Sequence, residues 1–107
     1  IGPIRDTIGR RRDNQGQNVI PGILNWLELG DVIGLVAPRP FATVAGESDP
    51  IWPAVGARKA VEEARAVYAA VGAANRLRVD SARGGHFFRP EDSWKALAAA
   101  IAGQSAP

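Results

Sequence analysis

The alternation of apolar and polar segments between residues 41 and 82 is the feature that most constrains the fold of this chain. Residues 41–45 (FATVA) form a short apolar run between turn residues, which is typical of a buried parallel strand. Residues 54–72 have one apolar face and one charged face, which predicts a helix. Residues 76–82 (RLRVDSA) alternate, which predicts a half-exposed strand near a sheet edge. A helix between two strands implies a right-handed crossover and a parallel strand pair.

Shorter elements are expected before this unit. Residues 1–18 have the composition of a loop. Residues 19–37 predict short helices, in which Pro21 opens the first helix and Gly30 ends it. Asp31 is then expected to cap the second helix.

A last helix is expected over residues 90–102, with acidic residues in its first turn, where the helix dipole favours them. Its buried face is expected to consist of apolar residues at helical spacing: Trp94, Leu97, Ala98 and Ile101. The three tryptophans are expected in the core or in the wall of a substrate pocket: Trp26, Trp52 and Trp94.

Two parallel strands make an incomplete sheet. Parallel sheets usually have about five or more strands, so the pattern predicts an α/β fold in which residues 1–107 are one part of a larger domain. The chain begins at Ile1 and contains no Met, which fits the expectation of a longer polypeptide. Alone, the chain is expected to leave a strand edge and helix faces uncovered. It should therefore be poorly stable, dimeric or prone to aggregation.

Two polar residues follow the predicted strands. Asp49 lies in the GESDP loop after the first strand, and His86 lies in the GGHFF loop after the second. Ligands of open α/β sheets bind outside the carboxyl ends of the strands. Because parallel strands end at the same edge, we expect Asp49 and His86 to lie close together.

His86 is the only histidine of the chain, and a lone histidine is often structural. Its setting favours a general base, the role that imidazole suits best near neutral pH. The preceding Gly84 and Gly85 allow close approach of neighbouring groups. Phe87 and Phe88 are expected to keep the imidazole partly dry.

Asp49 has an equally ordinary interpretation, because an aspartate before proline often stabilises a turn or caps a helix. Paired with His86, its carboxylate would set the tautomer of the base. A nucleophile is missing from this pair. None of the serines lies in a G-x-S-x-G turn, and Ser48 is too close to Asp49 in sequence to meet His86 productively.

Composition argues against several classes of function. Without Cys, the chain has no disulfide, thiolate metal site or cysteine nucleophile, and its single His makes a metal site or other cofactor unexpected. No apolar run approaches the roughly 20 residues of a membrane span. The net charge of +2 derives from residues 1–13, where Arg5 and the cluster Arg10–Arg12 stand against Asp6 and Asp13. This cluster lacks interleaved aromatic residues, so neither a membrane nor a nucleic acid is an expected partner.

Four motifs occur in order along the chain: NVIPGIL, DVIGLVAPRP, GESDPIWP and GGHFF. Together they resemble the C-terminal part of an α/β-hydrolase. They are most similar to the acetyl xylan esterase and dienelactone-hydrolase-like branch of serine esterases. The resemblance extends over residues 1–102.

The resemblance implies a catalytic triad in the chain order Ser, Asp, His. Asp49 then corresponds to the acid and His86 to the base, while the Ser and the oxyanion-hole amides belong to a region before Ile1. The implied substrate is a small ester or an acylated carbohydrate, and the implied activity requires the remainder of the hydrolase domain.

Two alternatives remain open. A serine peptidase of the prolyl-oligopeptidase kind carries a similar Asp and His in its final strands, and a propeller domain upstream of Ile1 would favour it. A non-catalytic α/β-hydrolase remnant would retain Asp49 and His86 without using them.

Overall fold

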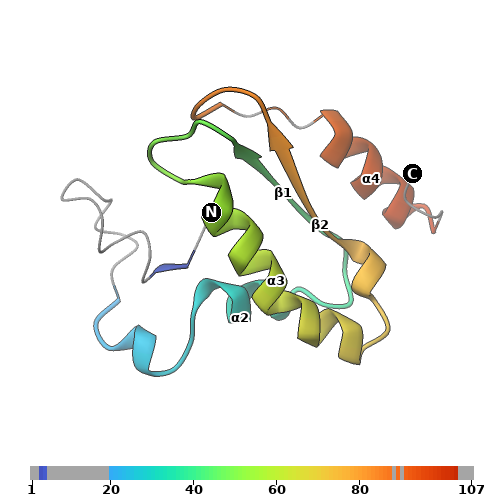
Figure 1. Ribbon diagram of the computed structural model, residues 1–107. Helices are drawn as coiled ribbons and strands as arrows, with labels where there is room; N and C mark the ends of the chain where they lie inside the picture. Colours follow the sequence, from blue (N-terminus) through green and yellow to red (C-terminus); the bar gives the residue numbers. More distant parts are fainter. Residues whose placement is uncertain (1–2, 5–19, 88, 90, 104–107) are drawn as a thin grey trace.

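The computed structural model describes residues 3–4, 20–87, 89 and 91–103, and it shows two strands with helices on either side (Figure 1). Strand β1 (Phe41–Gly46) and strand β2 (Leu77–Ala82) are parallel, and helix α3 (Ala54–Ala70) connects them. The predicted α/β class and parallel strand pair are thereby confirmed. The remaining elements are η2 (Ile23–Asn25), α2 (Leu29–Gly34), η3 (Ala74–Arg76) and α4 (Glu91–Ile101).

The register of the strands brings their carboxyl ends level. Phe41 pairs with Leu77 at one end of the sheet, and Gly46 pairs with Ala82 at the other. The loops that follow β1 and β2 therefore leave the same edge. Within the described residues the sheet has only these two strands.

Helix α3 supplies most of the core. Its buried residues recur at helical spacing: Ala54, Ala57, Ala60, Val61, Ala64 and Tyr68. The helix ends two residues before the predicted Gly72, because Gly72 adopts a left-handed conformation with φ of 69°. Leu77 of β2 and Ile33 of α2 pack against this buried face.

The predicted boundaries of the first helices are wrong. Gly30 lies inside α2 rather than at a helix end, and Glu28 rather than Asp31 is the N-cap. Asp31 completes a capping box by accepting a hydrogen bond from the backbone N–H of Glu28 at 2.8 Å. A Cβ at Gly30 would stand 3.0 Å from the carbonyl oxygen of Ala60, so this glycine allows α2 to pack closely on α3.

The predicted buried face of α4 is also wrong. The helix buries Ser93 and Ala96, whereas Trp94 is 68% exposed and Ile101 is 78% exposed. Ser93 donates a hydrogen bond to the carboxylate of Asp80 in β2, and this contact fixes the small-residue side of α4 toward the sheet. Among the described residues, nothing buries Trp94 or Ile101, whereas Leu97 is partly buried.

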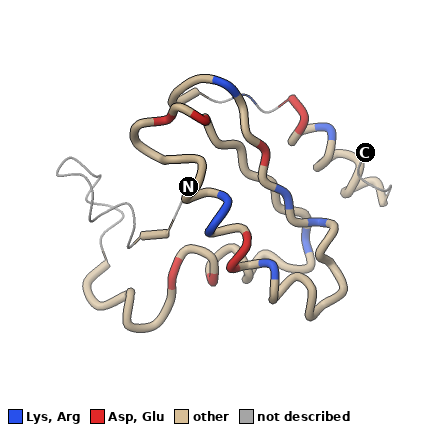
Figure 2. Tube along the Cα trace, viewed as in Figure 1, with Lys and Arg blue, Asp and Glu red and all other residues tan. Residues whose placement is uncertain are grey.

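Acidic and basic residues are interspersed along α3 and β2 rather than collected in one patch (Figure 2). In the part of the chain that the structure describes, no helix is long and apolar enough to span a membrane. Most of the loop predicted at 1–18, with Arg10–Arg12, lies outside the described residues.

Candidate active site

Backbone hydrogen bonds join the two loops at the carboxyl edge of the sheet. The N–H of Glu47 donates to the carbonyl of Ala82, and the N–H of Ser48 donates to the carbonyl of Gly84, both at 2.9 Å. These bonds continue the pairing of β1 with β2 beyond the strands. The loop that carries Asp49 is therefore fixed against the loop that carries His86.

Glycine is required where the two loops cross. A Cβ at Gly46 would overlap the carbonyl oxygen of Gly85 and would stand 2.9 Å from the carbonyl oxygen of Gly84. Gly84 itself has a φ of 112°, a conformation that side chains rarely allow. The close approach therefore requires glycine at position 46, whereas Gly84 is required by its backbone conformation.

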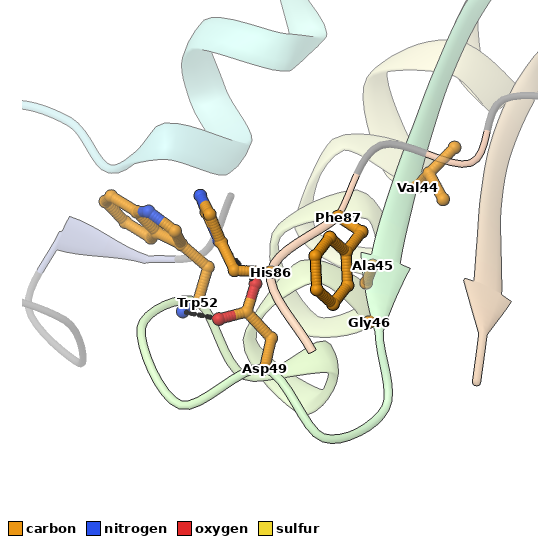
Figure 3. A pocket seen from close by; sticks show the side chains of 7 residues that line it. All are labelled: Val44, Ala45, Gly46, Asp49, Trp52, His86 and Phe87. Atoms are coloured by element: carbon orange, nitrogen blue, oxygen red, sulfur yellow. Dashed lines mark hydrogen bonds and ion pairs between the residues drawn. The ribbon is translucent and has the colours of Figure 1, made fainter. Parts of the chain in front are cut away.

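Asp49 and His86 form a hydrogen-bonded pair. The Nδ1 atom of His86 lies 2.8 Å from Oδ2 of Asp49 (Figure 3). The other carboxylate oxygen, Oδ1, accepts hydrogen bonds from the backbone N–H groups of Ile51 at 2.8 Å and Trp52 at 3.0 Å. Asp49 therefore stabilises a turn with one oxygen and contacts the imidazole of His86 with the other.

The surroundings keep Asp49 ionised. Its side chain is only 7% exposed, and burial by itself raises the pKa of the carboxyl group. The hydrogen bonds donated by Trp52, His86 and Ile51 outweigh burial, and the pKa of Asp49 falls below its ordinary value. An ionised carboxylate can only accept hydrogen bonds, so its contact with Nδ1 of His86 requires an N–H at that ring nitrogen.

The imidazole is more open to solvent than the sequence predicts. The side chain of His86 is 57% exposed, and the neighbouring Phe87 is itself 69% exposed, so the imidazole stays largely open to solvent. Phe88 lies outside the described residues. In Figure 3 the second ring nitrogen of His86 points away from Asp49.

Asp49 and His86 belong to the lining of a cavity of about 270 Å³. Its lining comes from the end of β1 and from both loops: Val44, Ala45, Gly46, Asp49, Trp52, His86 and Phe87. Trp52 is thus a pocket-wall residue, one of the two roles expected for the tryptophans. Trp26 is 86% exposed and belongs neither to the core nor to this cavity.

No described serine is hydrogen-bonded to His86. Ser81 accepts a hydrogen bond from Arg58, and Ser93 donates one to Asp80. Nor do the described residues contain a group of three or more His, Asp or Glu side chains placed to hold a metal ion.

A second polar cluster, which sequence reasoning missed, supports the site loop. Arg58 donates to Oε1 of Glu47 at 3.0 Å and to Oγ of Ser81 at 2.9 Å. The hydrogen bonds with Ser81 and Arg58 lower the pKa of Glu47. Periodicity assigns Arg58 only to the charged face of a helix, and its partners are distant in sequence, so no local signal could have revealed the cluster.

Comparison with known proteins gives one informative similarity. The chain is 37% identical over 68 residues to a protein of Bacillus subtilis (strain 168) named "Putative hydrolase YtaP". The aligned region is 64% of this chain and only 23% of that relative, so the chain spans about a quarter of its length. No protein-family profile matches the chain, and no solved structure matches it. The similarity supports a hydrolase in general terms.

Proposed function

We propose that this chain is the C-terminal part of an α/β-hydrolase domain and supplies the acid and the base of a serine carboxylic-ester hydrolase. The observation that carries the proposal is the contact of 2.8 Å between His86 Nδ1 and Asp49 Oδ2, made at the carboxyl edge of a parallel sheet. The motif resemblance favours the acetyl xylan esterase and dienelactone-hydrolase-like branch. The similarity to a protein named as a hydrolase supports the wider class.

In the proposed reaction, a seryl hydroxyl from outside residues 1–107 attacks the carbonyl carbon of the ester. Its proton passes to Nε2 of His86 as the new C–O bond forms, and the carbonyl electrons move to the oxygen. Asp49 stays ionised and stabilises the imidazolium. When the bond to the alcohol breaks, His86 returns the proton to the leaving oxygen.

A water molecule then repeats the sequence on the acyl-serine ester. His86 takes a proton from this water, the hydroxide attacks the acyl carbon, and the free acid leaves as the serine recovers its proton. The proposed substrates are small esters or acylated carbohydrates. Neither a cofactor, nor a nucleic acid, nor a membrane has a part in this proposal.

The test compares variants of the longer polypeptide that the proposal requires, with 4-nitrophenyl acetate as substrate. His86→Ala and Asp49→Asn should each lower kcat by about three to four orders of magnitude, because the members of a triad act as a unit. Asp92→Asn, which changes an exposed carboxylate in the first turn of α4, is the matched control and should leave the rate unchanged. Full activity of His86→Ala would refute the proposal and favour the alternative of a non-catalytic α/β-hydrolase remnant.

A further inference from the structure

Two aromatic side chains flank the proposed base. Trp52 from the first loop and Phe87 from the second line the same cavity as His86, and in Figure 3 the imidazole lies between them. Phe87 follows His86 directly and is 69% exposed. The cavity therefore has an aromatic side chain from each of the two loops in its lining.

The charge of the lining bears on which ligand the cavity can take. Among the described residues that line it, only Asp49 and His86 can ionise, and none is a Lys or Arg. The guanidinium of Arg89 lies outside this lining, stacked at 6.0 Å from the centre of the Phe87 ring. A negatively charged ligand in the cavity would meet the carboxylate of Asp49, which no Lys or Arg among the described lining residues offsets.

The lining also offers few hydrogen-bonding side chains. Both oxygens of Asp49 already accept hydrogen bonds, from Ile51 and Trp52 on one side and from His86 on the other. A flat apolar ring would gain contact with the faces or edges of the two aromatic side chains in the lining, Trp52 and Phe87.

The chemistry of ester hydrolysis places the ring on the alcohol side. His86 must reach the leaving oxygen in order to return its proton, so the groups beside His86 contact the leaving alcohol.

The size of the cavity fits a single ring. Its volume of about 270 Å³ exceeds the roughly 150 Å³ that suffices for benzene in a protein interior, and it has room for one ring rather than a polymer.

We propose that Trp52 and Phe87 form a specificity-determining subsite for an uncharged aromatic leaving alcohol, so that aryl esters are the preferred substrate class. This inference rests on the proposed function for its place in the reaction. The subsite itself is a property of the 107-residue chain and can be measured without turnover.

The test is a titration of the chain with phenol, followed by the ring-proton NMR signals of His86. These signals are unambiguous because His86 is the only histidine. Phenol should shift them saturably, and benzoate, the same ring with a negative charge, should bind at least tenfold more weakly. Phe87→Ala should weaken phenol binding at least tenfold, and Phe87→Trp should restore it. Trp26→Ala, which removes an exposed aromatic side chain outside the cavity, should bind phenol as the unaltered chain does.

Three results would overturn the subsite: undiminished phenol binding by Phe87→Ala, equal binding of benzoate, or tighter binding of methyl β-D-xylopyranoside than of phenol. The last result would assign the cavity to a sugar. Because Phe87 is exposed, its substitution leaves the core intact. A failure of the proposed function would appear instead as full esterase activity in His86→Ala, whatever the outcome with phenol.

Discussion

The carbonyl oxygen of Gly85 occupies the space that a Cβ on Gly46 would need. This relationship joins the last residue of β1 to the residue before His86. It explains how two loops more than 30 residues apart in sequence hold a carboxylate and an imidazole at hydrogen-bonding distance, 2.8 Å. The site geometry thus depends on a backbone contact as well as on the two side chains.

Gly46→Ala should therefore disturb both stability and the site. Forcing a methyl group into this contact should cost about 1–3 kcal/mol in the free energy of unfolding, as overpacking commonly does. Urea unfolding measures this loss, and the low-field NMR signal of the His86 Nδ1 proton should weaken as the loops separate. Gly85→Ala is the control: a Cβ there comes no closer than 3.9 Å to another atom, so it should be tolerated. Equal stability of the two variants would contradict the structure.

Asp49 should make stability depend on pH in the acid range. Its pKa is lower in the folded chain than its ordinary value of 3.8, so the ionised form stabilises the fold. This contribution is complete above the ordinary pKa and is lost as the pH falls through the lowered pKa of the folded state. Urea unfolding at pH values from 7 down to 2 should show the loss, and Asp49→Asn should show a flatter profile. An unchanged profile in the variant would exclude this role.

Tyr68 should be the most sensitive large side chain of α3. It is fully buried, and its hydroxyl donates a hydrogen bond to the carbonyl of Arg39 at 2.8 Å. Tyr68→Phe should cost about 0.5–1.5 kcal/mol through the lost hydrogen bond, and Tyr68→Ala about 3–5 kcal/mol through the cavity left behind. Val55→Ala, on the exposed face of the same helix, should change stability by no more than about 0.5 kcal/mol. Thermal or urea unfolding ranks the three variants.

The uncovered apolar face of α4 should make the isolated chain self-associate. Trp94 and Ile101 are mostly exposed and line one hollow of about 450 Å³ with Leu97 and Ala98. Trp94→Lys combined with Ile101→Lys should shift the chain toward monomer in sedimentation velocity. Trp26→Lys, which changes a still more exposed aromatic side chain outside α4, should not cause this shift. A monomeric unaltered chain with a sharp melting transition would contradict this prediction.

Sequence patterns predicted the parallel pair and the crossover helix because period-2 and period-3.6 alternation follow directly from strand and helix geometry. They failed at Gly30 and at α4 because tertiary contacts override local pattern. The close approach of α2 to α3 requires glycine inside a helix, and the bond from Ser93 to Asp80 turns a small-residue face toward the sheet.

The proximity of Asp49 and His86 was predictable from topology, since parallel strands end at one edge. Three features of the site were not. These features are the division of the two Asp49 oxygens between a turn and His86, the exposure of the imidazole, and the Arg58 cluster. All three depend on the directions of side chains across loops. No one-dimensional pattern encodes those directions.

The most direct test of the central claim is covalent labelling of the longer polypeptide with a fluorophosphonate, which reacts with a serine activated by a neighbouring base. Intact-protein and peptide mass spectrometry should find one label per chain, on a serine outside residues 1–107. His86→Ala should lower the labelling rate by about three orders of magnitude or more. Labelling that proceeds unchanged in His86→Ala, or that falls on Ser48, would contradict the assignment of Asp49 and His86 as the acid and base of a serine hydrolase.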